Sequence, residues 1–104
     1  MILRRRFAGL IERQLDLFAD DNADLLAQCA AAERAYDEAP RDEAEERYGD
    51  YLDLVETGTE ILASMRDHYT RESLDVEVSA EYLRAFNRAA VKRFPRFALE
   101  LEDT

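Results

Sequence analysis

The sequence has few of the residues that interrupt or cross-link a chain. Its 104 residues include three glycines, two prolines, one cysteine and no tryptophan. One cysteine excludes an internal disulfide, and Cys29 lies within an apolar pattern, so we interpret it as a small buried hydrophobic residue. No apolar run approaches the length of a membrane span, and charged residues interrupt the segment where a secretory signal needs apolar ones. We therefore expect a single helical domain over residues 1–104, in the cytoplasm.

The sequence also lacks a recognisable catalytic group. His68 is the single histidine, and its neighbours Asp67 and Tyr69 on a predicted helix favour a solvated surface side chain. The glycines are too far apart to form a phosphate-binding loop, and no serine has an evident base beside it. The sequence thus favours a protein that is not an enzyme, with metal-assisted chemistry by carboxylates as the alternative.

Two apolar patterns with helical spacing dominate the sequence. In each pattern the residues are alternately four and three apart, which predicts two long amphipathic helices. The patterns mirror each other about Pro40, so that the numbers of paired residues add up to 80 in an antiparallel hairpin. The first pattern comprises Ile11, Leu15, Phe18, Asn22, Leu25, Cys29, Ala32 and Tyr36, and the second comprises Ala44, Tyr48, Tyr51, Val55, Gly58, Leu62, Met65 and Tyr69.

These patterns predict an all-α fold of the helical-bundle type, in which a third helix packs on a long antiparallel hairpin. The predicted helices span about residues 2–38, 41–71 and 79–94, with Ser79 as the N-cap of the third. Residues 72–78, in which apolar and polar residues alternate, are predicted to form an extended connector.

Asn22 is the weakest point of the first predicted helix, because it follows two aspartates and is a poor residue for a helix interior. The apolar spacing passes through Asn22 without a shift, so we expect a continuous or slightly bent helix. Gly58 lies opposite in the mirrored pairing, flanked by Thr57 and Thr59, and a polar contact there would fix the register of the hairpin. A kink or solvated bend at residues 20–22 is the alternative.

Charge is strongly segregated along the chain. The net charge is −10, but residues 1–15 carry four arginines against one acid, residues 16–81 carry five bases against 20 acids, and residues 82–104 carry five bases against three acids. The overall acidity argues against general nucleic-acid binding, because phosphates are bound by excess basic charge. The basic ends either lie against the acidic hairpin of the same subunit or bind an acidic partner.

The third predicted helix carries a basic ridge next to an aromatic cluster of Phe86, Phe94 and Phe97. The basic residues are four apart, so they share one side of the helix. These candidate partner-binding residues suit an acidic helix or a phosphate-bearing ligand. The ridge comprises Arg84, Arg88, Lys92 and Arg96.

Four carboxylates are the alternative, metal-binding candidate. Pairing of the hairpin brings Glu33 and Asp37 toward Glu46 and Asp50, and oxygen ligands of this kind can hold Mg²⁺. Salt bridges to nearby arginines also explain these residues, and this is the interpretation that we favour.

Two short motifs in the last half of the chain resemble MazG-like nucleotide pyrophosphohydrolases. Leu83-x-x-x-Asn87 followed by Arg93-Phe94 is similar to the C-terminal helix of that family, and Gly49-Asp50-Tyr51-Leu52 is similar to the start of a metal-binding helix. The resemblance implies an all-helical, oligomeric, Mg²⁺-dependent hydrolase that uses Glu-x-x-Glu and Glu-x-x-Asp pairs. The sequence departs from this pattern, because Arg47 stands three residues before Asp50 and Ala30 three residues before Glu33. Such a site would be degenerate.

We therefore expect a small non-enzymatic helical interaction or regulatory protein that self-associates, binds an acidic partner, or does both. The alternative is a degenerate MazG-like hydrolase with Mg²⁺ as its cofactor. An apolar face that includes Leu54 and Ile61 predicts a homo-oligomer, with a dimer as the simplest form. We expect neither membrane insertion nor nucleic-acid binding.

Overall fold

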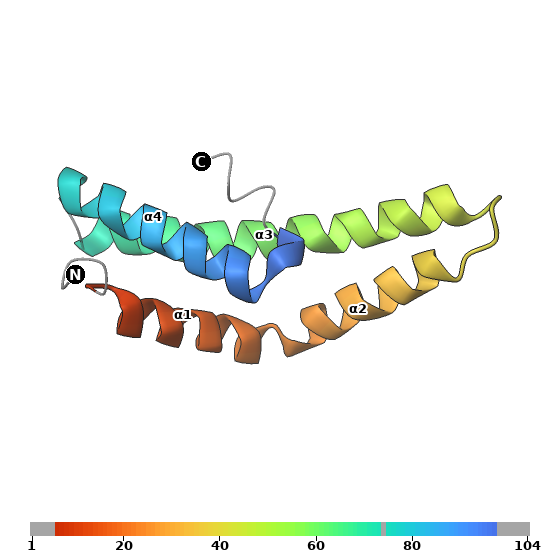
Figure 1. Ribbon diagram of the computed structural model, residues 1–104, viewed down its shortest axis with the longest axis horizontal. Coiled ribbons are helices and arrows are strands. Elements are labelled where there is room, and N and C mark those ends of the chain that lie inside the picture. Colours follow the sequence, from red (N-terminus) through yellow and green to blue (C-terminus); the bar gives the residue numbers. More distant parts are fainter. Residues whose placement is uncertain (1–5, 74, 98–104) are drawn as a thin grey trace.

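The computed structural model describes residues 6–73 and 75–97, and these residues form helices and no strand (Figure 1). The all-α prediction is confirmed. The elements are α1 (Ala8–Asp21), α2 (Ala23–Asp37), α3 (Ala44–Ser73), α4 (Val76–Arg93) and the short 3-10 helix η2 (Pro95–Phe97). The molecule is elongated, with extents of 51 × 25 × 25 Å.

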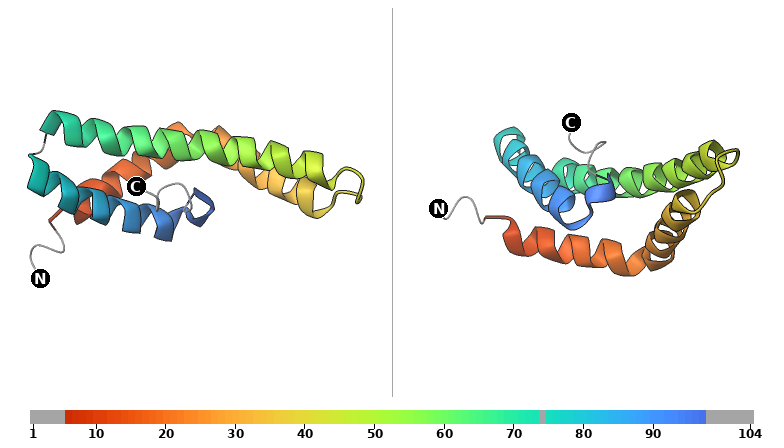
Figure 2. Two further views of the ribbon diagram at one scale, coloured as in Figure 1. Left: turned by 90° about the horizontal axis from the view of Figure 1, so that it is seen from above. Right: turned by 45° about the vertical axis from the view of Figure 1, so that its right-hand side comes forward.

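The helices form two unlike parts, which α3 joins along its length (Figures 1 and 2). At one end α1, α4, η2 and residues 58–73 of α3 surround a common core, and we call this part the bundle. At the other end α2 packs antiparallel on residues 44–57 of α3, and we call this two-helix part the arm.

Aromatic rings fill the centre of the bundle. Phe18 is fully buried, and its ring makes edge-to-face contacts with Phe94 and Phe97 at centroid distances of 5.2 and 6.1 Å. A Cβ atom on Gly58 would lie 2.5 Å from Cε1 of Phe97, so glycine allows this ring to pack directly on the backbone of α3. The buried hydrophobic residues are Phe7, Ile11, Leu15, Phe18, Cys29, Leu62, Tyr82, Phe86, Ala90 and Phe97.

The helix predicted over residues 2–38 is divided at Asn22 into α1 and α2, and residues 2–5 lie outside the described residues. The backbone N–H and the side-chain Nδ2 of Asn22 both donate to the carbonyl oxygen of Phe18, at 3.0 Å each. Asn22 therefore ends α1 by bonding back to it. The predicted polar contact with α3 is replaced by this local bond, while Gly58 contacts Phe97.

The predicted extended connector over residues 72–78 is wrong for most of its length. Helix α3 continues to Ser73, and α4 begins at Val76. The side chain of Asp75 accepts a hydrogen bond of 2.9 Å from the backbone N–H of Val78, so Asp75 is the N-cap that the sequence analysis assigned to Ser79. The Asp75 side chain accepts a hydrogen bond from a free N–H of the first turn, and α4 therefore starts about one turn before the predicted position.

The predicted mirrored pairing of the first and second apolar patterns holds for only part of the molecule. Antiparallel packing of α2 on α3 forms the arm as predicted, but α1 packs mainly on α4. Within the arm, the ring of Tyr36 lies 5.1 Å from the ring of Tyr48, one turn beyond Ala44, its predicted partner. The numbers of this ring pair add up to 84 rather than 80, so this contact is centred two residues after Pro40.

Candidate groove between α1 and α4

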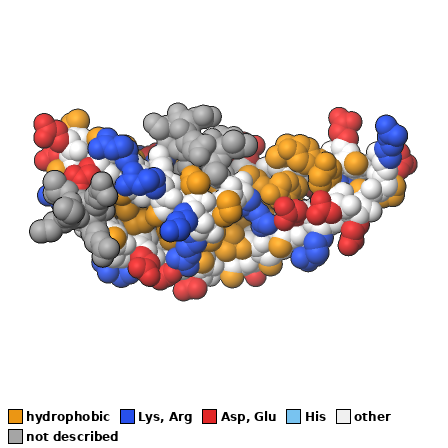
Figure 3. Space-filling view, in the orientation of Figure 1, with side chains coloured by type: hydrophobic (Ala, Val, Ile, Leu, Met, Phe, Trp, Pro, Cys, Tyr) orange, Lys and Arg blue, Asp and Glu red, His pale blue; other side chains and the backbone are white. Residues whose placement is uncertain are grey.

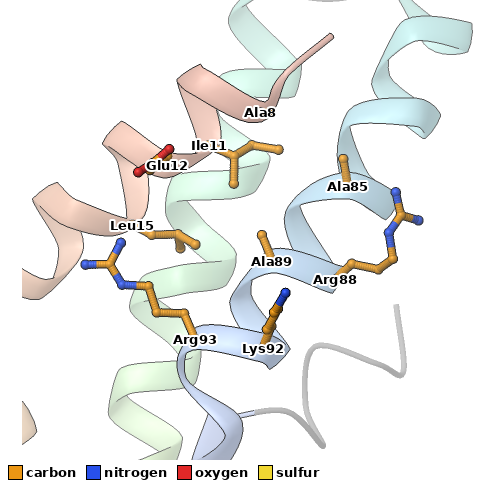
Figure 4. Close-up of a pocket in the computed structure, with 9 residues that line it drawn as sticks. All are labelled: Ala8, Ile11, Glu12, Leu15, Ala85, Arg88, Ala89, Lys92 and Arg93. Atoms are coloured by element: carbon orange, nitrogen blue, oxygen red, sulfur yellow. The ribbon is translucent and has the colours of Figure 1, made fainter. Parts of the chain in front are cut away.

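A groove of about 840 Å³ lies between α1 and α4 on the surface of the bundle (Figure 4). Its floor is apolar and its rim is charged. The floor consists of Ala8, Ile11, Leu15, Ala85 and Ala89, and the rim consists of Glu12, Arg88, Lys92 and Arg93.

The groove exists because small side chains of α4 face larger ones of α1. Ala85 and Ala89 are four residues apart, so they share the side of α4 that faces α1. Ile11 and Leu15 are buried below them, with 3% and 2% of their surfaces exposed. Two alanines in this position leave a gap that larger residues would have filled.

Polar contacts fix the separation of α1 and α4. The Tyr82 hydroxyl donates a hydrogen bond of 2.8 Å to Oε1 of Gln14. Nη1 of Arg93 lies 2.6 Å from Oδ1 of Asp16. The ring of Phe7 stands edge-on to the ring of Tyr82, with 5.4 Å between their centroids. The groove is thus formed by rigid helices rather than loops.

Burial raises the pKa of Tyr82 to about 12, against a partial lowering by its hydrogen bond to Gln14. The hydroxyl therefore stays protonated across the physiological range and remains a donor to Gln14. This bond helps to hold α4 against α1.

Of the three basic side chains of the rim, Arg93 pairs with Asp16, whereas Arg88 and Lys92 remain available for a ligand. Arg84, Arg88 and Lys92 are exposed, and none has an ion-pair partner among residues 6–73 and 75–97. Lysine and arginine side chains gather over α4 in the space-filling view (Figure 3). Three of the four residues of the predicted ridge therefore lie along one exposed side of α4, and Arg88 and Lys92 border the groove directly.

Arg96, the fourth residue of the predicted ridge, points to the arm instead. Its Nη2 donates a hydrogen bond of 3.0 Å to Oε1 of Glu33, and its guanidinium carbon lies 5.9 Å from the centre of the Tyr51 ring. The turn at Pro95 starts η2 and breaks the four-residue spacing of the ridge. Arg96 thus ties η2 to the arm and has a structural role.

Arg96 also approaches the buried thiol of Cys29. Burial raises the pKa of Cys29, and the positive charge and hydrogen bond of Arg96 lower it in part. The side chain is fully buried, which confirms the interpretation of Cys29 as a small core residue.

The four candidate metal ligands are not gathered into one site. Glu33 accepts from Arg96, and Oδ2 of Asp50 accepts from Nη1 of Arg47 at 3.0 Å. Across the described part of the chain, no group of three or more histidine, cysteine, aspartate or glutamate side chains is placed to hold a metal ion. Asp37 and Glu46 are exposed on the surface of the arm. Two of the four candidate carboxylates, Glu33 and Asp50, are thus paired with arginines.

One buried charged residue, Arg66, was not predicted from the sequence. Arg66 is 4% exposed on α3, where Nε bonds to Oδ1 of Asp67 at 2.9 Å and Nη1 bonds to Oδ1 of Asn87 at 3.0 Å. It ties α3 to α4 inside the bundle. Position 66 lies four residues after Leu62 of the second apolar pattern and therefore shares its side of the helix, which was the available signal.

Comparison with family models, with curated proteins and with solved structures found no match to the chain. The resemblance to MazG-like hydrolases is therefore not supported by a family match. Within residues 6–73 and 75–97, no helix combines the length and apolar character that crossing a membrane requires.

Proposed function

We propose that the protein is a non-enzymatic interaction protein whose α1/α4 groove binds an acidic amphipathic helix. The observation that carries this proposal is the combination of an apolar floor with basic side chains that have no ion-pair partner within the described residues. Such a surface fits a helix that has apolar residues on one side and carboxylates beside them.

The apolar floor supplies the affinity in this arrangement. Exposed ion pairs contribute only about 0.2–1 kcal/mol each, so Arg88 and Lys92 alone cannot hold a partner. Burial of the apolar surface that is still exposed at Ala8, Ala85 and Ala89 adds about 25 cal/mol per Å² of that surface. The basic rim then selects acidic over basic helices and orients the bound one.

The proposal is tested with a designed 18-residue peptide that has leucines three and four residues apart and glutamates elsewhere. A matched control peptide carries lysine in place of every glutamate. Fluorescence anisotropy is expected to show binding of the acidic peptide, weakened by added salt, and no comparable binding of the basic peptide. Equal binding of both peptides, or of neither, would overturn the proposal.

Variants locate the binding surface. Replacement by Arg88→Glu and Lys92→Glu together is expected to weaken acidic-peptide binding about tenfold or more, with the melting temperature unchanged. The control variant, Arg41→Glu with Arg71→Glu, changes the net charge equally at exposed positions outside the groove. A large loss of melting temperature in the groove variant would instead assign these side chains to the stability of the subunit.

A further inference from the structure

We infer that the acidic helix bound by the groove is the arm of a second copy of this chain. The inference rests on the proposed function and adds the identity of the partner. Each copy would then place its arm in the groove of the other, and the pair would form a twofold dimer.

The arm exposes an unusual amount of apolar surface. Tyr36, Tyr48 and Leu52 are 38%, 45% and 43% exposed, and they are three of the five large hydrophobic residues exposed in the described chain. The rings of Tyr36 and Tyr48 lie 5.1 Å apart, so the two helices present one continuous patch. We call these three residues the arm patch. Hydrophobic side chains flanked by acidic ones appear on the arm in Figure 3.

The charge of the arm is opposite to that of the groove rim. Residues 37–56 contain nine acids and two bases. Glu45 precedes Tyr48 by one turn and Glu56 follows Leu52 by one turn, so both border the arm patch. Both are exposed and lack an ion-pair partner within the described part of the subunit. They are complementary to Arg88 and Lys92 of another copy.

Gly49 is a second observation in favour of a contact on the arm. It lies in the interior of α3, where glycine costs about 0.5–1 kcal/mol relative to alanine. Nothing lies within 4 Å of the position that its Cβ would occupy, so packing within the subunit does not require a glycine. A glycine next to Tyr48 permits close approach of another helix at that point.

The arm cannot reach the groove of its own subunit. The groove lies between α1 and α4, and the tip of the arm is at the opposite end of a molecule 51 Å long (Figures 1 and 2). Contact between the arm patch and a groove is therefore intermolecular. Two copies related by a twofold axis, with their long axes antiparallel, would satisfy both grooves and both arms at once, and no groove or arm would be left for a third copy.

A charge-swap experiment tests the inference on the full chain. The groove variant is Arg88→Glu with Lys92→Glu, and the arm variant is Glu45→Lys with Glu56→Lys. The parent is expected to sediment as a dimer at low salt, and each variant alone is expected to dissociate about tenfold or more readily. An equimolar mixture of the two variants restores both contacts, so the dimer is expected to return.

The outcomes separate the inference from the proposed function. A parent that stays monomeric but binds the acidic peptide overturns the inference and leaves the proposed function in place. A parent dimer that neither variant weakens, or that the mixture does not restore, uses another surface and also overturns the inference. Failure of both peptide binding and dimer formation overturns both. If a reversed charge prevents folding, neutral variants replace the charge-swap variants: Arg88→Gln with Lys92→Gln, and Glu45→Gln with Glu56→Gln. Each neutral variant is expected to weaken the dimer in the same direction by a smaller factor.

Discussion

The bundle and the arm are built from the same kind of amphipathic helix, yet they differ in how completely they bury it. Eight of the ten buried hydrophobic residues lie in the bundle, Phe7 packs on it from the position just before α1, and Cys29 is the one that belongs to the arm. Two packed helices leave both outer faces open to solvent, whereas a third helix closes a core. The bundle therefore supplies most of the buried core of this chain, and the arm supplies exposed apolar surface.

Core truncation is expected to produce the largest difference between the two parts. Phe18→Ala removes a fully buried ring that contacts Phe94 and Phe97, so the free energy of unfolding should fall by about 3–5 kcal/mol. Leu52→Ala removes a side chain that is 43% exposed in the arm, and its cost should be below about 1 kcal/mol. Urea unfolding of both variants measures the difference. Similar losses in the two variants would contradict the division into a stabilising bundle and an exposed arm.

Alkaline pH is expected to weaken the bundle through Tyr82. Its pKa is raised to about 12 in the folded chain from the ordinary value of 10, so an unfolded chain releases the proton first. Between these two pKa values the folded state binds more protons, and stability falls as the pH rises. The contribution is on the order of 2 kcal/mol, fully present below the lower pKa and lost above the higher one.

Urea unfolding of the parent and of Tyr82→Phe at about pH 9 and pH 11 isolates this effect. The variant lacks the hydroxyl and therefore the hydrogen bond to Gln14, so at the lower pH it should be less stable than the parent by about 1 kcal/mol. It should also lose less stability than the parent on going to the higher pH. An equal loss in both proteins would show that Tyr82 is not the group responsible.

The sequence predicted the parts of the fold that depend on local periodicity. Helical spacing correctly indicated α2, α3 and α4, and it indicated antiparallel packing of α2 on α3. It favoured a continuous helix through Asn22 over the alternative kink at residues 20–22, because a bend that preserves the apolar spacing leaves the pattern unchanged. It also could not show that α1 packs on α4, since the same apolar face of α1 fits either neighbour.

The candidate site was predictable only in its charged half. A spacing of four residues placed Arg84, Arg88 and Lys92 along one side of α4, but Pro95 turned Arg96 away. The apolar floor depends on Ala85 and Ala89 facing Ile11, and such a gap arises from tertiary packing that periodicity does not encode. Arginine partners were anticipated for the four carboxylates, and the structure pairs Glu33 with Arg96 and Asp50 with Arg47.

Two glycines of α3, Gly58 in the bundle and Gly49 in the arm, are expected to respond oppositely to substitution by alanine. Gly58→Ala places a methyl group against the buried ring of Phe97, at a cost of about 1–3 kcal/mol that a gain in helix propensity of up to about 1 kcal/mol only partly offsets. The variant should therefore unfold at a temperature several degrees lower. Gly49→Ala meets no atom in its own subunit and should raise the melting temperature of the monomer.

Thermal unfolding monitored by circular dichroism, at concentrations below self-association, compares the two variants directly. Opposite shifts are the expected result. A Gly58→Ala protein as stable as the parent would mean that η2 can move away from α3 without loss. The Gly49→Ala variant should in addition weaken the dimer if the arm approaches another helix at that residue.

Substitution of Asn22 is expected to have the smallest effect, and it tests the boundary between the two parts. Asn22→Ala removes the bond from Nδ2 to the carbonyl oxygen of Phe18 but leaves the backbone bond to the same oxygen. The bond is worth about 1 kcal/mol, and the higher helix propensity of alanine returns part of that amount. A net loss of about 0.5 kcal/mol in the free energy of unfolding is expected from urea titration.

Gln14→Ala provides a matched amide deletion within the bundle, where the Tyr82 hydroxyl loses its partner, and its cost should be the greater. If Asn22→Ala were instead the more destabilising of the two, the bend between α1 and α2 would depend on the amide itself. The present geometry assigns the bend mainly to the packing of α1 on α4 and of α2 on α3, because those contacts remain when the amide is removed.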